Sequence, residues 1–483
     1  MKTALNKIFT QDIGTIHFIG IGGIGMSGMA EILHTLGYKI QGSDLSENYV
    51  TERLKKNGIK IINNHVAANV EGASLIVRST AVKDDNPEVI SARDFNIPII
   101  KRSDMLAELM RFKHAISISG THGKTTTTSL ISTIFDAADL KPTVINGGII
   151  NQRGTNAYFG EGDYLIAEAD ESDGTFIRVP SYVAVITNID PEHLDYYGTF
   201  ENAKLAYRIF IENLPFYGFA VLCYDHPVVR EIGTSIVDRR IIRYGINETD
   251  VDIRAENIRQ LESGMVFDVV LNENYARKKR LTDNTIKDIY LGIHGRHNVL
   301  NSLAAIAVSI EKNIPIDTIK KALQEFSGVR RRFIKTGEVN GVTIIDDYAH
   351  HPEEIKATLS TARSLADMKG GNVIAVMQPH RYSRLKDLMV DFSKSFANAN
   401  TIIVSDIYSS GEDPIEGVTS EALISAIKNN ANQTAIKLDD PNKLAKKINT
   451  LAKSSDIVVL LGAGSITKWA YELPKQLENL HKV

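Results

Sequence analysis

The sequence predicts an α/β fold of three domains, and three observations support this: the length, the alternation of short apolar strands with helices, and two glycine-rich loops. At 483 residues the chain is too long for one ordinary core, and roughly 150 residues per domain gives about three domains. Strands that alternate with helices are typical of parallel sheets covered on both faces. We expect domain boundaries that give residues 1–112, 113–327 and 328–483.

In the first domain, an apolar strand at residues 15–21 is followed by glycines and by a helical pattern at residues 26–36. Further short strands are expected at residues 39–42, 74–77 and 98–100, with helical sequence between them. This alternation predicts a Rossmann-like, doubly wound parallel sheet.

The second domain opens with a strand at residues 114–119 that enters another glycine loop, and strands at 164–169 and 182–187 end in polar sequence. These features predict a mostly parallel sheet like that of P-loop ATPases. Residues 238–293 differ, because short alternating runs are separated by turns, and they predict an antiparallel, β-rich annex. A helix at residues 299–312 closes the domain.

In the third domain, strands are expected at residues 343–345, 372–377, 401–405 and 457–461. Helical patterns alternate with them, as at residues 352–368. The third domain is therefore predicted to be a second Rossmann-like sheet.

Composition excludes several classes of function. The net charge of -3 provides no general field that would attract nucleic acid, so phosphate binding must come from local sites. The single cysteine, Cys223, cannot form an internal disulfide or a cysteine zinc site. The most apolar stretches, residues 16–29 and 457–463, are broken by glycine and shorter than the roughly 20 residues that span a bilayer. We expect a cytoplasmic protein without a signal peptide, membrane insertion or nucleic-acid partner.

The first glycine loop, residues 20–25, has the pattern G-x-G-x-x-G, follows a strand and opens a helix. Asp44 lies about 20 residues further on, as in dinucleotide-binding folds. Glycines let a pyrophosphate approach the backbone, and the start of the helix provides free N–H groups. The ligand could be NAD, FAD or a UDP-sugar, and the motif alone favours NAD.

The second glycine loop, residues 120–125, reads Gly-Thr-His-Gly-Lys-Thr and matches the end of a Walker A loop. The usual first glycine is replaced by Ile118. Lys124 can reach the β/γ-phosphates, and the Thr125 hydroxyl can bind Mg²⁺. Two phosphate loops on separate sheets indicate two nucleotides, which neither a plain dehydrogenase nor a plain NTPase requires.

Polar clusters follow the other strands of the second domain. Residues 168–173 are rich in carboxylates that suit Mg²⁺, although the pattern does not tell which of them binds. Residues 188–195 follow the next strand and contain His193. An open α/β sheet binds its ligands at the carboxyl ends of its strands, which favours a functional role for both clusters.

The third domain carries its own clusters, with three arginines at residues 330–332 and polar sequence after strands at residues 346–352 and 378–384. Arginines at strand ends can neutralise a phosphoryl group or bind a carboxylate with two parallel hydrogen bonds. An amino-acid substrate would bring such a carboxylate.

Taken in order, these motifs resemble the Mur ligase family over essentially the whole chain. Single motifs are weak, but the ordered set is specific. The matching segments are GIGGIGMSGMAE (20–31), GTHGKTT (120–126), EADESDGTF (168–176), NIDPEHLDYYG (188–198), GRHNVLN (295–301), RRF (331–333), DDYAHHP (346–352), QPHRYSRL (378–385) and GAGSITK (462–468).

The resemblance implies an ATP-dependent ligase that adds L-alanine to UDP-N-acetylmuramate through an acyl phosphate, with Mg²⁺ as its metal. The implied partners are these small molecules, and the implied state is a monomer or a weak homodimer. The third domain would contribute to both ATP and amino-acid binding.

The resemblance also implies roles for individual residues. The UDP-sugar would contact Gly20, Gly22, Gly23, Gly25, Met26, Ser27, Asp44, Ser79, Thr80 and Arg102. ATP would contact Gly120, Thr121, His122, Gly123, Lys124, Thr125, Thr126, Asn298, Asn301, Arg332 and Asp347. The amino acid would contact Tyr348, His380, Arg381 and Arg384. The expected metal ligands are Thr125, Glu168 and His193, and the expected catalytic residues are Lys124, Glu168 and His193.

Three alternatives remain open at this point. The nearest is a ligase of the same fold that adds a peptide or another amino acid. An NAD-dependent oxidoreductase built on the first loop would bind NADH and need no ATP. A non-enzymatic, ATP-gated binding protein would bind nucleotide without forming an amide.

Overall fold

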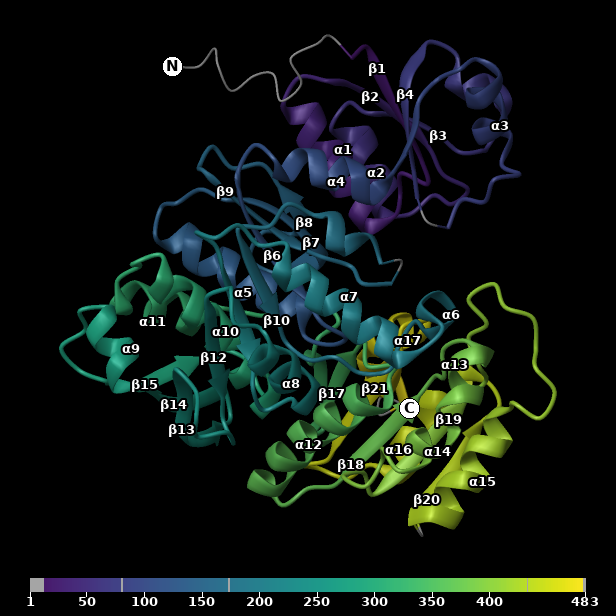
Figure 1. The fold of residues 1–483 in the computed structure, drawn as a ribbon. Helices are drawn as coiled ribbons and strands as arrows, with labels where there is room; N and C mark the ends of the chain where they lie inside the picture. Colours follow the sequence, from purple (N-terminus) through teal and green to yellow (C-terminus); the bar gives the residue numbers. More distant parts are fainter. Residues whose placement is uncertain (1–12, 80, 173, 432, 481–483) are drawn as a thin grey trace. The chain divides into compact units, whose positions relative to one another are not determined.

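The strands of the computed structural model form three sheets (Figure 1). The residues described are 13–79, 81–172, 174–431 and 433–480. The chain divides into two compact units. The hydrophobic core that the first and second sheets share belongs to the first unit. The first unit comprises residues 1–256, 268–289 and 300–327, and the second comprises 257–267, 290–299 and 328–483. Among the described residues, no helix has both the length and the apolarity that a membrane span requires.

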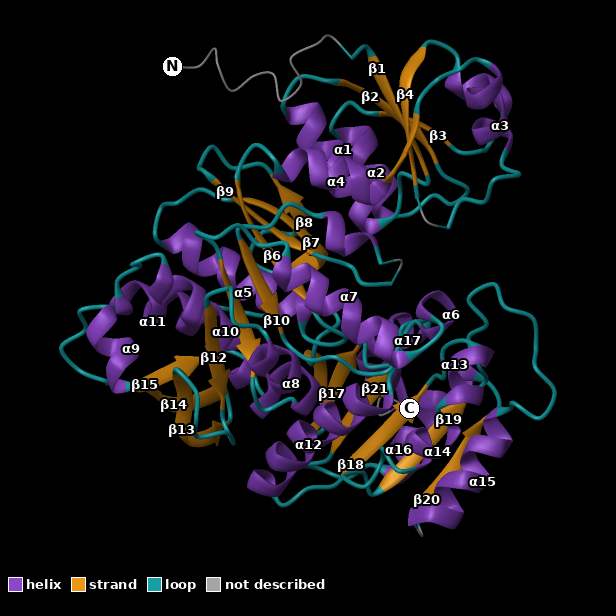
Figure 2. Cartoon of the chain, in the orientation of Figure 1, coloured by secondary structure: helices purple, strands orange, loops and turns teal. Residues whose placement is uncertain are grey.

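The first sheet is entirely parallel, with the order β3-β2-β1-β4-β5. Figure 2 shows helices α1, α2, α3 and α4 around it. Its central strand is buried along nearly its whole length, as expected for a strand covered on both faces. The predicted doubly wound sheet is therefore confirmed. The strands are β1 (Thr15–Ile19), β2 (Lys39–Ser43), β3 (Lys60–Ile62), β4 (Ala73–Arg78) and β5 (Ile99–Lys101). The helices are α1 (Ile24–Thr35), α2 (Tyr49–Lys56), η1 (Ala67–Val70), α3 (Pro87–Asp94) and α4 (Arg102–Met110).

The second sheet has ten strands in the order β15-β14-β13-β12-β11-β10-β6-β9-β7-β8. Its strands are β6 (His114–Ser119), β7 (Thr143–Ile150), β8 (Thr155–Tyr158), β9 (Tyr164–Glu168), β10 (Val183–Ile186), β11 (Phe219–Cys223), β12 (Ile241–Gly245), β13 (Ile253–Leu261), β14 (Gly264–Leu271) and β15 (Thr285–Leu291). Its helices are α5 (Lys124–Ala137), η2 (Thr175–Arg178), α6 (Leu194–Tyr197), α7 (Phe200–Glu212), α8 (Pro227–Ser235), α9 (Glu273–Lys278), α10 (Arg296–Glu311) and α11 (Ile316–Glu325).

The annex is not simply antiparallel, and that expectation was wrong for its first strands. β12 pairs in parallel with β11, and β13 pairs in parallel with β12, so the annex continues the central sheet. For the β11–β12 pair the physical reason is helix α8, which lies between these two strands in the chain and provides the crossover that parallel strands need.

Sequence patterns did not reveal the β7–β8 hairpin, which joins the first two sheets. β7 pairs in parallel with β9 and antiparallel with β8. Gly28 of α1 lies so close that a Cβ on it would be 2.5 Å from the Cβ of Ala157 in β8. Arg53 of α2 donates a hydrogen bond to the Asn156 side chain (3.0 Å). Residues of both sheets consequently share one hydrophobic core, which includes Met29 and Leu165.

The third sheet has the order β16-β17-β21-β18-β19-β20, and every pair is parallel except β16–β17. Separate apolar cores pack on its two faces, which confirms the predicted second doubly wound sheet. The strands are β16 (Ile334–Val339), β17 (Val342–Asp347), β18 (Val373–Met377), β19 (Thr401–Ser405), β20 (Thr434–Leu438) and β21 (Ile457–Leu461). The helices are α12 (Pro352–Lys369), α13 (Tyr382–Asp387), α14 (Met389–Ser393), α15 (Ser420–Ala431), η3 (Pro441–Lys443), α16 (Leu444–Leu451) and α17 (Ile466–Leu480).

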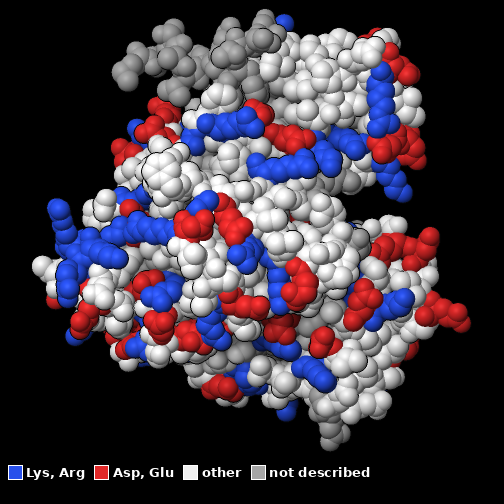
Figure 3. Space-filling view, viewed as in Figure 1, with Lys and Arg blue, Asp and Glu red and all other residues white. Residues whose placement is uncertain are grey.

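Basic and acidic side chains are interspersed on the face of the molecule shown in Figure 3. This mixture agrees with the small net charge of -3. Binding of anions must therefore be explained by particular groups rather than by a general field.

One carboxylate is fully buried inside the first domain. Glu88 of α3 accepts hydrogen bonds from the side chains of Ser43 (2.6 Å) and Asn69, and lies 3.7 Å from the imidazole of His17. Burial alone would raise the pKa of Glu88, but the contacts with His17, Ser43 and Asn69 outweigh burial and lower that pKa. The ionised form of Glu88 therefore stabilises the fold.

We predict that Glu88→Gln lowers the free energy of unfolding by about 1–3 kcal/mol at pH 7, because it weakens a buried hydrogen-bond network. The ionised Glu88 carboxylate contributes its full stabilisation above the pKa of about 4.3 that a glutamate has in the unfolded chain. This stabilisation is lost as pH falls through the lower pKa of Glu88 in the folded protein. The difference in melting temperature between variant and wild type should thus shrink below pH 4.3. Glu71→Gln, at an exposed position, is the control, and an equal effect of both changes would contradict the prediction.

Candidate active site

Three polar loops of the second sheet meet at one edge. β6 pairs in parallel with β9 on one side and with β10 on the other, so all three strands end at the same edge. The glycine loop follows β6, the acidic segment follows β9, and the loop that contains His193 follows β10. The convergence predicted from the sequence is therefore what the structure shows.

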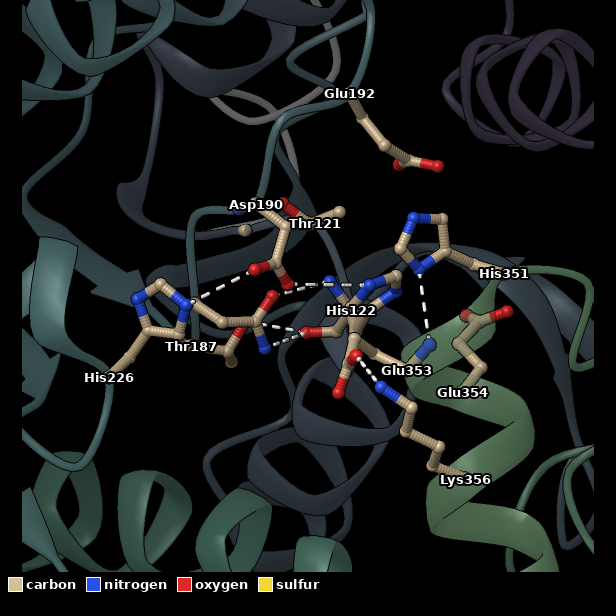
Figure 4. Close-up of polar contacts among 12 residues, drawn as sticks. Thr121, His122, Thr187, Asp190, Glu192, His226, His351, Glu353, Glu354 and Lys356 are labelled. Carbon is tan, nitrogen blue, oxygen red and sulfur yellow. Dashed lines mark hydrogen bonds and ion pairs between the residues drawn. The ribbon is translucent and has the colours of Figure 1, made fainter. Parts of the chain in front are cut away.

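The loop after β10 holds the glycine loop in place (Figure 4). Backbone N–H groups of Thr121 and His122 donate to the carbonyl and the side-chain oxygen of Asn188 (3.2 and 2.7 Å). In return, the Asp190 N–H donates to the Thr121 hydroxyl (2.8 Å), and the Thr187 hydroxyl donates to the His122 carbonyl (2.6 Å). These bonds fix the shape of the loop.

Asp190 also lies between two imidazoles, as Figure 4 shows. Its carboxylate oxygens are 3.5 Å from Nε2 of His122 and 3.4 Å from Nε2 of His226. The sequence had singled out the segments that contain His122 and Asp190, but not His226.

Two glycines of the second loop are required by their conformation and by their neighbours. Gly120 and Gly123 have φ values of +133° and +86°. A Cβ on Gly120 would lie 2.2 Å from the Thr187 hydroxyl, and one on Gly123 would lie 2.6 Å from the Asn301 side-chain oxygen. The structure therefore places Asn301 beside the loop. Asn298, one turn earlier on α10, donates to the His294 carbonyl (2.6 Å).

Lys124, the first residue of α5, folds back onto the loop. Its ammonium donates to the carbonyls of Gly120 and Thr121 and forms an ion pair with Glu171 (2.8 Å). Burial alone would lower the pKa of Lys124, but Glu171 and Asp170 outweigh burial and raise that pKa, so Lys124 stays charged. Burial raises the pKa of the Glu171 carboxyl despite the nearby ammonium.

The start of α5 can receive an anion. Thr125 and Thr126 occupy its first turn, where the described residues place no acidic side chain. Thr126 is buried and Thr125 is half-buried. The N–H groups and the positive end of the helix dipole therefore lie beside the Lys124 ammonium.

A candidate cation site lies next to Lys124. Glu171, Glu192 and His193 each offer a ligand atom, and these atoms lie within 4.8 Å of one another. Oε2 of Glu171 is buried and has no hydrogen-bond partner among the described residues. Two carboxylates with a buried, unsatisfied oxygen fit a hard divalent cation such as Mg²⁺. His193 adopts a left-handed conformation (φ 55°), which is strained for a residue with a side chain.

Glu168 lies at the end of β9 and faces β7. A Cβ on Gly147 of β7 would lie 2.4 Å from one of its oxygens, and its other oxygen is buried without a hydrogen-bond partner in the described part of the chain. Its place in metal binding stays a prediction, as do those of Thr125 and His193. The structure adds Glu171 and Glu192 as candidates, and both lie in polar segments that the sequence had singled out.

The first glycine loop surrounds the start of α1. Gly20 has a φ of +78° and packs against Ser79, and the Gly22 N–H donates to the Asp44 carboxylate (2.8 Å). Helix α1 begins after Gly23 without a side-chain cap or an acidic first turn in the described structure. Its N–H groups are thus suited to a diphosphate.

Two of the residues predicted for the UDP-sugar lie in the core at the start of α1. Met26 and Ser27 are buried, and the Ser27 N–H already donates to the Gly23 carbonyl (2.9 Å). Thr80 lies outside the described residues.

Arg102 connects the two loops. Its guanidinium lies over the start of α1, only 2.7 Å from where a Cβ of Gly25 would be. It also forms an ion pair with Asp170 (2.7 Å), the residue before Glu171. Burial alone would raise the pKa of Asp170, but Arg102 and Lys124 outweigh burial and lower that pKa. The family resemblance implied a role for Arg102, and Asp170 lies in the acidic segment that the sequence had singled out, but the pairing of the two was not predicted.

In the third domain, the loops after β17, β21 and β18 also share one edge, because these strands are parallel neighbours. Asp347 accepts hydrogen bonds from the N–H groups of Phe333 and Ala349 (both 2.7 Å), and burial raises its pKa to about 6. Arg332 contacts Glu354 (3.3 Å) and lies over the Tyr348 ring. Asp347 therefore shapes the loop that carries Arg332.

A cluster of imidazoles and arginines follows β18. The rings of His350 and His380 are 5.9 Å apart, and Arg384 donates to Nδ1 of His380 (3.4 Å). Burial, followed by the charges of His350, Arg384 and Arg381, lowers the pKa of His380 to about 4. Arg381 has a φ of +70°, another strained conformation. This concentration of positive charge fits a ligand carboxylate.

Comparison with known proteins covers all three domains. The family model for the Mur ligase family, catalytic domain, matches residues 15–114, the Mur ligase middle domain matches 118–309, and the Mur ligase, glutamate ligase domain, matches 331–464.

Individual relatives match over nearly the full length. The UDP-N-acetylmuramate–L-alanine ligase of Brucella anthropi is 52% identical over 477 residues, which cover 99% of each chain. The crystal structure of UDP-N-acetylmuramate-alanine ligase MurC from Thermotoga maritima is 27% identical, with a TM-score of 0.80 over 97% of this chain and 100% of that one. A MurF ligase from the same organism, solved in complex with ADP, shares the fold at 19% identity, with a TM-score of 0.62 over 91% of this chain and 95% of that one. The chain belongs to the Mur ligase family.

Proposed function

We propose that this protein is an ATP-dependent ligase that joins L-alanine to UDP-N-acetylmuramate and releases ADP and phosphate. The product, UDP-N-acetylmuramoyl-L-alanine, is the first amino-acid adduct in the synthesis of peptidoglycan precursors. The observation that carries the proposal is the presence of two phosphate loops on two sheets of one unit, which the ion pair Arg102–Asp170 connects. The pair Lys124–Glu171 lies beside the second loop. The 52% sequence identity to a ligase of this specificity, over 99% of the chain, supports the choice of substrates.

The two loops have different ligands in this proposal. The diphosphate of the UDP-sugar binds at the start of α1, beside Arg102, and the phosphates of ATP bind on the loop before α5. A dehydrogenase would leave the second loop without a role. Because both nucleotides are cytoplasmic metabolites, we propose a cytoplasmic enzyme, working as a monomer or a weak homodimer.

Magnesium fits the carboxylates at the end of β9. Glu171, Glu192 and His193, together with the predicted ligands Glu168 and Thr125, are the residues that would hold it. When bound, the ion supplies positive charge that offsets the charge developing on the phosphate oxygens.

The reaction then divides into two steps. The lactyl carboxylate of the sugar attacks the γ-phosphorus of ATP, which gives an acyl phosphate and ADP. The amine of L-alanine attacks the acyl carbon, and the tetrahedral intermediate collapses to the amide and phosphate. The protein contributes positions and charges: Lys124 neutralises the phosphoryl oxygens, and the loops hold the reactants in line.

The basic cluster of the third domain receives the amino acid. Arg381 and Arg384 are suited to the alanine carboxylate, with neutral His380 beside them. Arg332 and Asp347 contribute to the binding of ATP.

We predict that purified protein given ATP, Mg²⁺, UDP-N-acetylmuramate and L-alanine forms ADP, and that omitting either acceptor or amino acid abolishes ADP formation. A coupled ADP assay, with mass spectrometry of the product, measures this. Glycine and a tripeptide should replace alanine poorly. Efficient use of a tripeptide would instead indicate a peptide-adding ligase. Absence of ADP formation would contradict the proposed ligase activity.

Lys124→Ala should lower kcat by about three orders of magnitude, because it removes the charge that neutralises the transferring phosphoryl group. Calorimetric titration with UDP-N-acetylmuramate should give a Kd close to that of wild type, since Lys124 belongs to the second loop. Near-normal turnover would contradict the role of Lys124.

Gly123→Ala should weaken ATP binding by about tenfold or more, since its Cβ would displace Asn301 and the backbone there has φ +86°. Gly37→Ala is a matched control, because Gly37 has φ +89° but its Cβ would meet no atom of the described residues within 4 Å. Isothermal titration with a non-hydrolysable ATP analogue separates the two. Equal losses of affinity for the ATP analogue in both variants would mean that backbone strain alone, and not the contact with Asn301, is responsible for the weaker binding.

A further inference from the structure

We propose that Tyr408, in the loop that follows β19, is a positioning residue for the amino-acid site, where it holds His380 and Arg381 in their working geometry. The inference rests on the proposed function, because it assigns a determinant of alanine binding to that site. Tyr408 lies in none of the polar motifs that the sequence singled out.

The backbone of Tyr408 extends the third sheet beyond the ends of its strands. β18 and β19 are parallel neighbours, and a further isolated parallel bridge joins His380 to Tyr408. The Tyr408 N–H donates to the Pro379 carbonyl (2.8 Å), and the Arg381 N–H donates to the Tyr408 carbonyl (2.9 Å). These two bonds bracket His380 and hold Arg381 in its strained conformation, with φ +70°.

The side chain of Tyr408 covers His380. The two rings are stacked, with centroids 5.5 Å apart and planes inclined by 12°. The tyrosine also lies against Gly464, where a Cβ would be only 2.6 Å from the Tyr408 ring. Tyr408 is nevertheless 41% exposed, so a role in filling the hydrophobic core does not explain why a tyrosine stands at this position.

A second contact from the same loop fixes the other end of the basic segment. Glu412 accepts hydrogen bonds from the Ser383 N–H (3.0 Å) and hydroxyl (2.6 Å). Helix α13 starts at Tyr382 and has no side-chain cap from its N-cap residue, Arg381. Glu412 therefore supplies the cap from a distant part of the chain.

Stacking has a chemical consequence for His380. Arg384 donates to Nδ1 of this imidazole, and only a neutral ring can accept that bond. Burial is the largest cause of the low pKa of His380, with His350, Arg384 and Arg381 acting in the same direction and Glu412 opposing them. Tyr408 covers one face of the ring, so its loss would hydrate the imidazole and favour protonation.

The first test compares Tyr408→Ala with Tyr408→Phe in steady-state assays at pH 8. Tyr408→Ala should raise the KM for L-alanine about tenfold, the value of a lost aromatic stack, while the KM values for ATP and UDP-N-acetylmuramate change less than twofold. Tyr408→Phe keeps the ring and should restore the KM. Tyr217→Ala removes an exposed tyrosine of the first unit, as a control, and should leave all three KM values unchanged.

The second test follows His380 without any turnover. In protein labelled with ¹³C at histidine and assigned with His380→Gln, the wild-type His380 signal should not shift between pH 5.5 and 8. In Tyr408→Ala it should titrate within that range, and in Tyr408→Phe it should not.

An unchanged KM for alanine in Tyr408→Ala would overturn the proposal, as would equal rises in all three KM values with a lower melting temperature. If the wild-type protein forms no amide, the proposed function fails. The histidine titration would still show whether Tyr408 controls His380, so the two failures can be told apart.

Discussion

Parallel pairing of β10, β6 and β9 is the constraint on which the rest of the candidate site depends. Neighbouring parallel strands end at one edge of the sheet, so the glycine loop, the acidic segment and the loop of His193 are brought together by backbone hydrogen bonds. The sheet therefore brings the three loops together, and side-chain hydrogen bonds only fix their detailed positions. Asn188 and Asp190 pin the glycine loop, and Lys124 folds onto it.

The same rule organises the third domain with other side chains. β17, β21, β18 and β19 are consecutive in the sheet, so segments separated by up to about a hundred residues contribute to one edge. Here the backbone ladder continues past the strands, through His380 and Tyr408. The strained conformations of Arg331, Phe333 and Arg381 all occur near this edge. Strain at such positions is typical of residues held for binding rather than for stability.

The sequence predicted most strands and the loops at their ends, because apolar runs and glycine motifs are local signals. Strands 114–119, 401–405 and 457–461 have the expected bounds. The β7–β8 hairpin was missed because Asn146 and two glycines interrupt its apolar run, and only pairing with β9 makes it a strand. Spacing could not reveal the pairing of Asp170, in the acidic segment, with Arg102, which lies 68 residues away. It also could not identify Tyr408, because the importance of Tyr408 comes from its contact with His380, 28 residues away.

The ion pairs of the first unit also bear on selectivity. In the structure, Lys124 forms an ion pair with Glu171, and Arg102 forms one with Asp170. Under the proposed function, an incoming phosphate would exchange one ionic partner for another, so its net gain would be a difference between two similar attractions. A free phosphate ion that meets a single cation gains little from such an exchange. Ligands that engage a helix start, a cation and a metal together would gain more, so under the proposed function the acidic partners would compete most effectively with small anions.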